Sequence, residues 1–471
     1  MVLTRTTRLL MLVFGLILAL STLPSRASER STVVYLPLVQ NAPANNVFGL
    51  EMVAISEQRG FSAALELQPS WIRRNGLRWS DVEPLENGGY NWSHRRVLAL
   101  EKEMIIASKR GIDLILIVRA SPRWATKPYQ ADCAPINAAH YDDFARFMTA
   151  AVDRYSRPPY NVRYWELGNE PDAFVFPGDS VFGCWGLVDD EYYGGRQYGA
   201  MLNVVYPAMK AANPKIQVLN GGLLLDREYD PATGEGLSGR FFEGMLVAGA
   251  GNSFDILSYH DYVPYNVVRG PPNSWKPRYL RRIMEQFAVN KPLMNTEGAL
   301  LCNEDSLACR TAQAYAVGRL YARAARDNLL GHIWYIYDSD GFRHTALIDT
   351  NDFSTLRPAY IAFHYTSNRL ASAQFIGPIT GQRLSVEGYR FQRGREEVVI
   401  VWSDSNAQAT ITVPEGAQPA CTEWDGTSFA CTANEGQLTL SVGMAPRYVT
   451  FARLEPASCD LTTYPTQEGC S

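Results

Sequence analysis

Eight short apolar runs, separated by longer stretches with helical periodicity, constrain the fold of this chain more than any other feature. The runs span residues 47–55, 71–77, 112–118, 162–167, 216–224, 254–259, 292–295 and 332–337. Between them, two sets of apolar residues each fall on one helical face: Tyr141, Phe144, Met148, Ala151, Val152 and Tyr155, and then Tyr198, Met201, Leu202, Val205 and Met209. Strands that alternate with amphipathic helices form βα units and a parallel sheet. The pattern predicts an α/β fold, a (β/α)8 TIM barrel over residues 47–370, with a doubly wound open sheet as the alternative.

The pattern changes near residue 370, where the helical periodicity gives way to short runs of period two. These runs span residues 389–393, 398–402, 409–413, 438–442 and 447–451, and Gly, Pro, Asn and Asp turns separate them. Such a series is typical of a β-sandwich. We therefore expect a small C-terminal β-sandwich domain over residues 371–455, followed by a tail over residues 456–471.

The N-terminus has the pattern of a secretory signal peptide. Arg5 and Arg8 precede an apolar run over residues 9–20, and the small-x-small sequence Ser25-Arg26-Ala27 follows it. The run is shorter than the roughly 20 apolar residues that a membrane span needs. We expect residues 1–27 to be a signal peptide and residues 28–46 a linker, which predicts a secreted protein with no membrane insertion after signal removal.

The cysteines indicate a disulfide-bonded protein. There are eight of them: Cys133, Cys184, Cys302, Cys309, Cys421, Cys431, Cys459 and Cys470. An even number in an exported chain predicts disulfides, because the compartment is oxidising. Close spacing favours the pairs 302–309, 421–431 and 459–470, which leaves 133 with 184, although spacing alone leaves other connectivities open. No metal site is expected, since there is no C-x-x-C pair and the chain has only six His.

The charge of the chain disfavours nucleic acid as a partner. Removal of residues 1–27 takes away three arginines and no acidic residue, which moves the formal net charge from −4 to −7. The 10 Trp, 25 Tyr and 19 Phe provide flat apolar faces suited both to a core and to stacking on sugar rings. The oligomeric state has no signal in the sequence.

Two glutamates lie at matching strand ends. Glu170, in Asn169-Glu170-Pro171, follows the fourth apolar run, and Glu297 ends the seventh. Because TIM barrels build their sites at the C-terminal ends of the strands, we expect both carboxylates at one rim. Cleavage of a glycosidic bond requires such a pair, in which one carboxyl group protonates the departing oxygen and the other attacks or stabilises the anomeric carbon.

These motifs resemble the signature of clan A glycoside hydrolases, which are retaining (β/α)8 enzymes. The likeness extends over roughly residues 47–365, and the sandwich resembles the accessory domain of families such as 39, 51 and 30, with family 5 also similar in its barrel. The resemblance implies that Glu170 is the general acid/base and Glu297 the nucleophile, that the substrate is a carbohydrate and that no cofactor is needed. It does not assign one family within the clan.

The resemblance also implies supporting residues. Asn169 corresponds to the asparagine that binds the sugar 2-hydroxyl, and His260 and Tyr262 match a His-x-Tyr pattern in which the tyrosine hydroxyl contacts the nucleophile. Arg74 is placed at the strand-two arginine beside the nucleophile, with neighbouring Arg73 as the competing choice. Alternation along the second strand allows only one of the two to point inward.

Three tryptophans are candidate sugar platforms. Trp334 resembles the residue that floors the subsite of the cleaved sugar, and Trp124 and Trp79 are weaker candidates. Four other acids near strand ends could bind hydroxyl groups and are not ranked: Glu51, Asp261, Asp340 and Asp349. The alternative function is a non-catalytic carbohydrate-binding surface protein that keeps the barrel scaffold.

Overall fold

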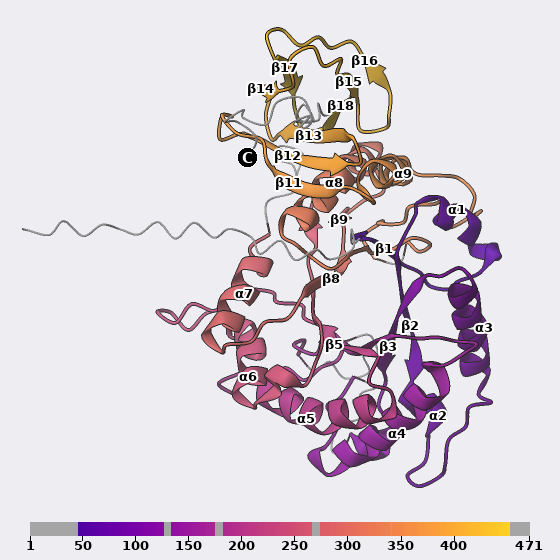
Figure 1. The fold of residues 1–471 in the computed structure, drawn as a ribbon. Helices are drawn as coiled ribbons and strands as arrows, with labels where there is room; N and C mark the ends of the chain where they lie inside the picture. The colour runs from indigo at the N-terminus through magenta and orange to yellow at the C-terminus, as the bar shows by residue number, and fades with distance from the viewer. Residues whose placement is uncertain (1–45, 127–132, 175–181, 266–273, 341, 453–471) are drawn as a thin grey trace, which may run out of the picture. The chain divides into compact units, whose positions relative to one another are not determined.

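The computed structural model describes residues 46–126, 133–174, 182–265, 274–340 and 342–452 (Figure 1). The predicted signal peptide, nearly all of the predicted linker and the predicted pair of Cys459 with Cys470 lie outside these ranges. No helix within the described ranges is both long enough and apolar enough to cross a bilayer.

Each of the eight apolar runs supplies one strand of a single parallel sheet. The strands are β1 (Phe48–Glu51), β2 (Trp71–Arg78), β3 (Asp113–Arg119), β4 (Tyr164–Asn169), β5 (Gln217–Gly222), β6 (Leu257–His260), β8 (Leu293–Gly298) and β10 (His332–Trp334). Their order is β5-β4-β3-β2-β1-β10-β8-β6, and the isolated parallel bridges Leu219↔Ile256 and Leu223↔Tyr259 join the two ends. The predicted barrel is confirmed, and the open-sheet alternative is wrong.

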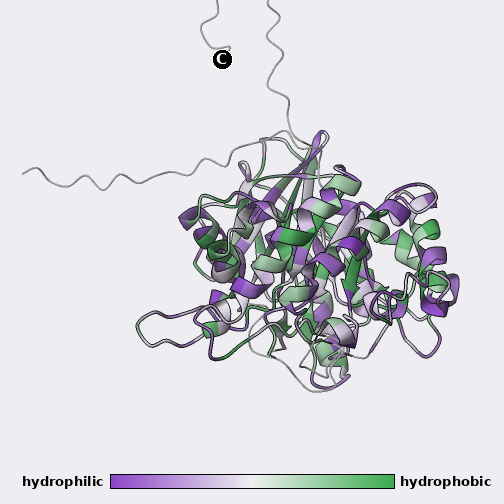
Figure 2. Cartoon of the chain, turned by 90° about the horizontal axis from the view of Figure 1, so that it is seen from below, coloured by the Kyte–Doolittle hydropathy of each residue, from purple (hydrophilic) through white to green (hydrophobic). Residues whose placement is uncertain are grey.

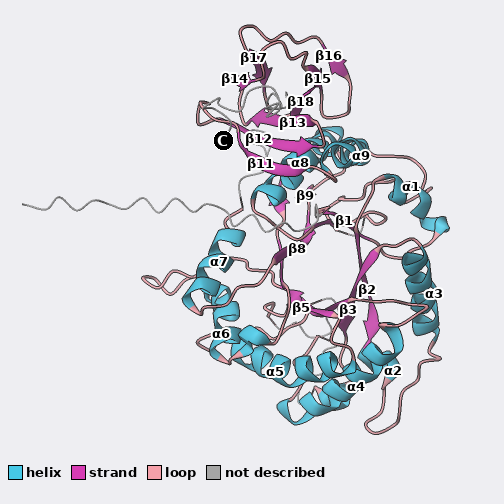
Figure 3. Ribbon diagram, in the orientation of Figure 1, coloured by secondary structure: helices cyan, strands magenta, loops and turns pink. Residues whose placement is uncertain are grey.

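Helices surround the barrel (Figures 1 and 3). They are α1 (Phe61–Glu66), α2 (Trp79–Val82), α3 (Arg95–Lys109), α4 (Tyr141–Tyr155), α5 (Gly195–Ala212), α6 (Phe241–Val247), α7 (Lys276–Gln286), α8 (Leu307–Arg326) and α9 (Pro358–Leu370). Figure 2 shows hydrophobic and hydrophilic residues interspersed along them. The apolar faces predicted for α4 and α5 are buried, because they pack on the outer wall of the sheet.

After α9 the chain forms antiparallel strands. A six-stranded sheet contains β11 (Gln374–Pro378), β12 (Val386–Arg393), β13 (Glu396–Ser403), β18 (Arg447–Ala452), β15 (Ala420–Thr422) and β16 (Ser428–Phe429). A second sheet pairs β14 (Ala407–Thr412) with β17 (Gln437–Val442). Both sheets share one apolar core that includes Val401, Ile411, Leu440 and Val449, which is the arrangement of the predicted sandwich.

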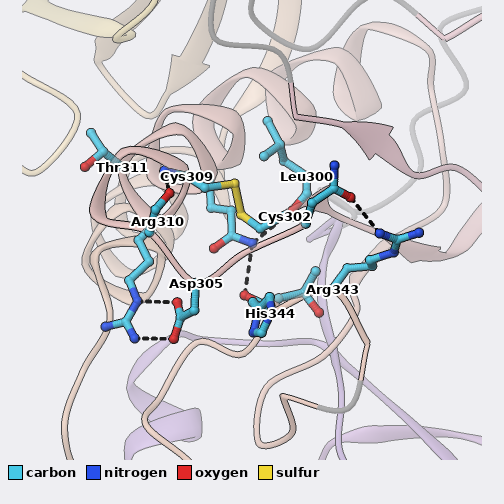
Figure 4. Close-up of a disulfide and its surroundings, with 12 residues drawn as sticks. Leu300, Cys302, Asp305, Cys309, Arg310, Thr311, Arg343 and His344 are labelled. Carbon is cyan, nitrogen blue, oxygen red and sulfur yellow. Dashed lines mark hydrogen bonds and ion pairs between the residues drawn. A yellow bond between two sulfur atoms is a disulfide. The ribbon is translucent and has the colours of Figure 1, made fainter.

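The described residues contain three disulfides: two join pairs that close spacing favoured, and the third joins the pair that was left over. They are Cys133–Cys184, Cys302–Cys309 and Cys421–Cys431. Figure 4 shows Cys302–Cys309, which ties the segment after β9 (Leu300–Leu301) to the first turn of α8, next to the Arg310–Asp305 ion pair. Cys133–Cys184 spans 51 residues and connects the loop after β3 to the loop after β4. Three disulfides fit the oxidising environment of an extracellular protein.

Candidate active site

Glu170 and Glu297 face each other at the C-terminal rim of the barrel. An oxygen from each carboxyl group and a nitrogen of His260 all lie within 4.8 Å of one another. Both glutamates are buried, with side-chain exposures of 7 and 8 %. Carboxyl oxygens within 4.8 Å of each other are compatible with the roughly 5 Å between the carboxyl groups of retaining glycosidases and are closer than the roughly 6.5–9.5 Å of inverting ones.

The backbone delivers Glu170 to this position in an unusual conformation. Glu170 follows the last residue of β4 with φ of +49°, in the left-handed region. Its N–H donates to the carbonyl of Gly222 at the end of β5, at 3.1 Å. A side chain at Gly222 would place a Cβ 2.1 Å from Nε2 of His260, so only glycine permits this close approach. Left-handed backbone at non-glycine residues is concentrated at functional sites.

Glu297 receives a cation and a hydroxyl donor. Nη1 of Arg73 donates to its Oε1, and the hydroxyl of Tyr262 donates to its Oε2. A guanidinium and a phenol both stabilise the negative charge of a carboxylate. Both oxygens of Glu297 therefore accept a hydrogen bond from a buried or partly buried side chain.

Glu170 has a different environment. Nδ1 of His260 lies 2.7 Å from its Oε1. Burial raises the pKa of Glu170 to about 7, against the opposing effects of Arg73 and Lys276. Burial lowers the pKa of His260 to about 4, so the imidazole is neutral at neutral pH. The two carboxyl groups thus differ in their partners: one contacts a cation and a phenol, the other a neutral imidazole.

The assignment of Arg74 to the site is wrong, because Arg73 occupies it. The guanidinium of Arg73 is fully buried, and besides Glu297 it contacts Oε2 of Glu166 at 2.6 Å, Oε2 of Glu51 at 2.5 Å and Oδ1 of Asn169 at 2.7 Å. Arg74 points to the opposite face of β2, where its Nε contacts Glu103 of α3 at 2.6 Å. Successive residues of a strand point to opposite faces, so the error is a slip of one residue.

Trp334 does not lie in the site, because the same alternation points its side chain away from it. Trp334 is fully buried with the residues that pack the outer wall of the barrel, and its Nε1 donates to the carbonyl of Thr345 at 2.9 Å. Its neighbour Tyr335 is half-buried and lies edge-on to Tyr262, with 5.9 Å between ring centroids. Phe342, 38 % exposed, lies 5.2 Å from the Tyr262 ring. Tyr335 and Phe342 therefore lie against the ring of Tyr262, where Trp334 does not reach.

Of the two weaker candidates, Trp79 is a core residue. It is fully buried in α2, its Nε1 donates to Glu83 at 2.8 Å and its ring packs on Phe147 of α4. It offers no face to a ligand. Trp124 lies after β3, is half-buried, contacts Trp79 edge-on at 5.3 Å and donates to the carbonyl of Glu83 at 3.2 Å. Trp124 is therefore packed against the core without being fully buried.

Comparisons with known proteins give structural matches only. No family model matches the sequence, and no curated protein matches it. A family 39 glycoside hydrolase from the gut symbiont Bacteroides cellulosilyticus WH2 aligns with a TM-score of 0.67 at 20 % identity, covering 87 % of this chain and 81 % of that one. A GH30 endoxylanase from Clostridium papyrosolvens C71 aligns at 0.57 and 13 % identity, covering 86 % and 96 %. The GH39 enzyme from Xanthomonas axonopodis pv. citri aligns at 0.57 and 13 % identity, covering 88 % and 95 %.

The fold is therefore that of glycoside hydrolase families 39 and 30. The sequence-based resemblance is confirmed for the fold, and no family is assigned to the chain. In this glycoside hydrolase fold, the carboxylate pair lies at the rim where TIM barrels carry their chemistry.

Several residues of the site had no sequence signal of their own. Glu166 lies in β4, four residues before Glu170. Its carboxylate accepts from the Thr296 hydroxyl at 2.9 Å as well as from Arg73. Of the four unranked acids, Glu51 belongs to the Arg73 cluster, and burial raises its pKa to about 8. The others have different partners: Asp340 contacts Arg357 and Thr350, Asp349 contacts Asn351, and Asp261 lies 4.0 Å from Lys276.

The cluster of Glu170, His260 and Glu297 is the one group in the described ranges whose ligating atoms could hold a metal ion. Its donors already have protein partners, because Arg73 and Tyr262 occupy the Glu297 oxygens and His260 contacts Glu170. We assign no metal to this site.

Proposed function

We propose that this chain is a secreted retaining O-glycoside hydrolase in which Glu170 is the general acid/base and Glu297 the nucleophile. The observation that carries the proposal is the buried pair of carboxyl groups, within 4.8 Å at one rim, with unlike partners. Carboxyl groups in direct reach of a single anomeric carbon suit double displacement, since an inverting mechanism needs room for a water between them.

In the first step, an oxygen of Glu297 bonds to the anomeric carbon while the glycosidic C–O bond breaks. Glu170 gives its proton to the departing oxygen, so the aglycone leaves as a neutral alcohol. Arg73 and Tyr262 hold the attacking carboxylate in place. In the second step, Glu170, now ionised, takes a proton from water, which attacks the same carbon and releases Glu297. Two displacements at one carbon retain its configuration.

The chemistry needs no cofactor, because side chains supply both the proton transfer and the nucleophile. Asn169 lies within hydrogen-bond distance of Arg73 and next to the acid, where it can reach the sugar 2-hydroxyl. The rings of Tyr335 and Phe342, with the partly exposed Trp124, provide apolar faces for the C–H side of a pyranose. The substrate class we propose is a plant or microbial polysaccharide, oligosaccharide or glycoside.

We predict that kcat/KM falls as the pH rises through about 7, because burial raises the pKa of Glu170 to about 7 and the ionised acid cannot protonate the leaving group. Above pH 7, kcat/KM should fall by close to tenfold per pH unit for substrates with poor leaving groups. This fall is the alkaline limb of the pH profile. It should be absent for a dinitrophenyl glycoside, whose leaving group needs no proton. A kcat/KM that stays constant to pH 9 for a poor leaving group would remove Glu170 from the acid role.

A panel of chromogenic aryl glycosides and polysaccharides tests the proposal against the alternative of a non-catalytic binder. Release of chromophore by the wild-type protein supports hydrolysis. A saturable complex with a sugar, together with no release from any member of the panel, would favour the binder.

A further inference from the structure

The barrel has a seam between β5 and β6, and the candidate acid lies beside it. These two strands are the ends of the ladder order and are joined by isolated bridges and not by a regular ladder. Glu170 is held from both sides of the seam: its N–H donates to Gly222 at the end of β5, and its carboxyl group contacts His260 at the end of β6. The geometry of the acid therefore depends on how this seam is closed.

Lys276, the first residue of α7, bridges the seam at the rim. Its Nζ donates to the carbonyl of Leu224, after β5, at 2.8 Å and to the carbonyl of His260 at 2.6 Å. The N–H of Leu224 donates to Asp172 at 2.7 Å, and Asp172 lies two residues after Glu170. These hydrogen bonds, together with the backbone between Glu170 and Asp172, form a closed ring of contacts. The ring runs from the acid through Asp172, Leu224, Lys276 and His260 back to the acid.

The ammonium group also adds positive charge near the acid. Its two hydrogen-bond acceptors are neutral carbonyls, its nearest paired carboxylate is Asp261 at 4.0 Å, and its side chain is 13 % exposed. After Arg73, Lys276 is the second cation that lowers the pKa of Glu170. The other titratable groups that act on Glu170 or face it are Glu166, Asp172, Asp226, His260, Tyr262, Glu297 and Tyr335.

We propose that Lys276 is a positioning residue that closes the β5–β6 seam, holds His260 against Glu170 and supplies a positive charge to the acid. The inference rests on the proposed function, in which Glu170 donates the proton. A purely structural lysine would anchor α7 and leave the titration of Glu170 unchanged.

The test replaces Lys276 with Met, which keeps an apolar stem of similar length and removes the charge and both donors. We expect kcat/KM near pH 6 to fall about tenfold, since two charge-assisted hydrogen bonds are lost. We expect the alkaline limb to move up by about one pH unit, because removal of a nearby cation favours the protonated acid. Lys276→Arg, which retains the charge and the donors, should restore the wild-type limb.

Lys210 provides a matched control at the other end of the same seam. Its Nζ donates to the carbonyl of Ile216, before β5, at 2.7 Å and to Asp255, before β6, at 3.1 Å. Lys210→Met should lower the melting temperature and leave the limb where it is. An unshifted limb in Lys276→Met, or an equal shift in Lys210→Met, would overturn the proposal.

A second readout needs no turnover. The melting temperature of Glu170→Gln should rise relative to that of the wild type as the pH rises from about 4.5 to 7. Over this range the carboxyl group ionises in the unfolded wild type and stays protonated in the folded one, which costs stability that Gln does not lose. Repeating this pair with Lys276→Met should extend that rise to higher pH, because the rise starts at the unfolded-state pKa and ends at the folded-state pKa. If no substrate is hydrolysed, the proposed function fails while this shift still tests Lys276. A rise that levels off at the same pH in both pairs would refute the role of Lys276.

Discussion

Glu297→Gln is expected to reduce kcat/KM by about 10⁴-fold or more, with little change in the melting temperature. The amide keeps the shape of the side chain and its contact with Tyr262, but it cannot form the covalent bond to the anomeric carbon. The measurement is hydrolysis of whichever aryl glycoside the wild type cleaves best. Glu101→Gln is the matched control, because Glu101 is a buried glutamate that contacts Arg154 and Tyr155 away from the site.

A smaller variant separates loss of the nucleophile from general damage. In Glu297→Ala, added azide should occupy the vacated space, attack the activated glycoside once and give a glycosyl azide of inverted configuration. Full activity in Glu297→Gln, or equal losses in Glu297→Gln and Glu101→Gln, would show that Glu297 is not the nucleophile.

Arg73→Met is expected to lower kcat/KM about 10²- to 10³-fold and to destabilise the fold. The guanidinium contacts Glu51, Glu166 and Glu297, and its removal leaves buried carboxylates without their cation. Breaking a buried ion pair in this way costs about 3–5 kcal/mol, and the nucleophile loses the charge that orients it. Thermal melting and kcat/KM, measured on the same preparation, check both parts.

Arg74→Met is the control, since the two arginines are adjacent and differ in the face they occupy. Arg74 contacts Glu103 of α3 and the carbonyl of Asn75, both away from the carboxylate pair, so its replacement should leave kcat/KM within about threefold of the wild type. A large loss of activity in Arg74→Met with a mild effect in Arg73→Met would reverse the assignment and restore the sequence-based choice.

The fold could be predicted because the apolar runs and the helices between them have different periods. Each run became a strand, and the two glutamates lie together because strand ends of a barrel meet at one rim. Close cysteine spacing was sufficient for Cys302–Cys309 and Cys421–Cys431, since short loops are the easiest to close.

The register of the strands could not be predicted, and this explains both Arg74 and Trp334. Strands of a parallel barrel are buried on both faces, so apolar residues occupy inward and outward positions alike and alternation leaves no trace in the sequence. The structure shows an inner layer of Trp71, Ile115, Tyr164, Leu219, Ile256, Met294 and Ile333. Two residues further along the strands come Arg73, Glu166 and Tyr335, which face the site, while Arg74 and Trp334 face the helices.

The prediction that Trp79 is a sugar platform was wrong for a different reason. Its segment directly after β2 was expected to reach the cleft, but it forms α2, and the ring turns into the core against Phe144 and Phe147. The seam that Lys276 closes was equally invisible, because its contacts are to backbone carbonyls of residues distant in sequence.

The central claim is tested most directly by the configuration of the sugar when it is first released. Proton NMR should follow hydrolysis of a glycoside of known anomeric configuration, with spectra recorded before mutarotation equilibrates the product. The carboxyl separation at Glu170 and Glu297 predicts that the first-formed hemiacetal has the configuration of the substrate. Initial formation of the opposite anomer would contradict the double displacement and the role given to Glu297.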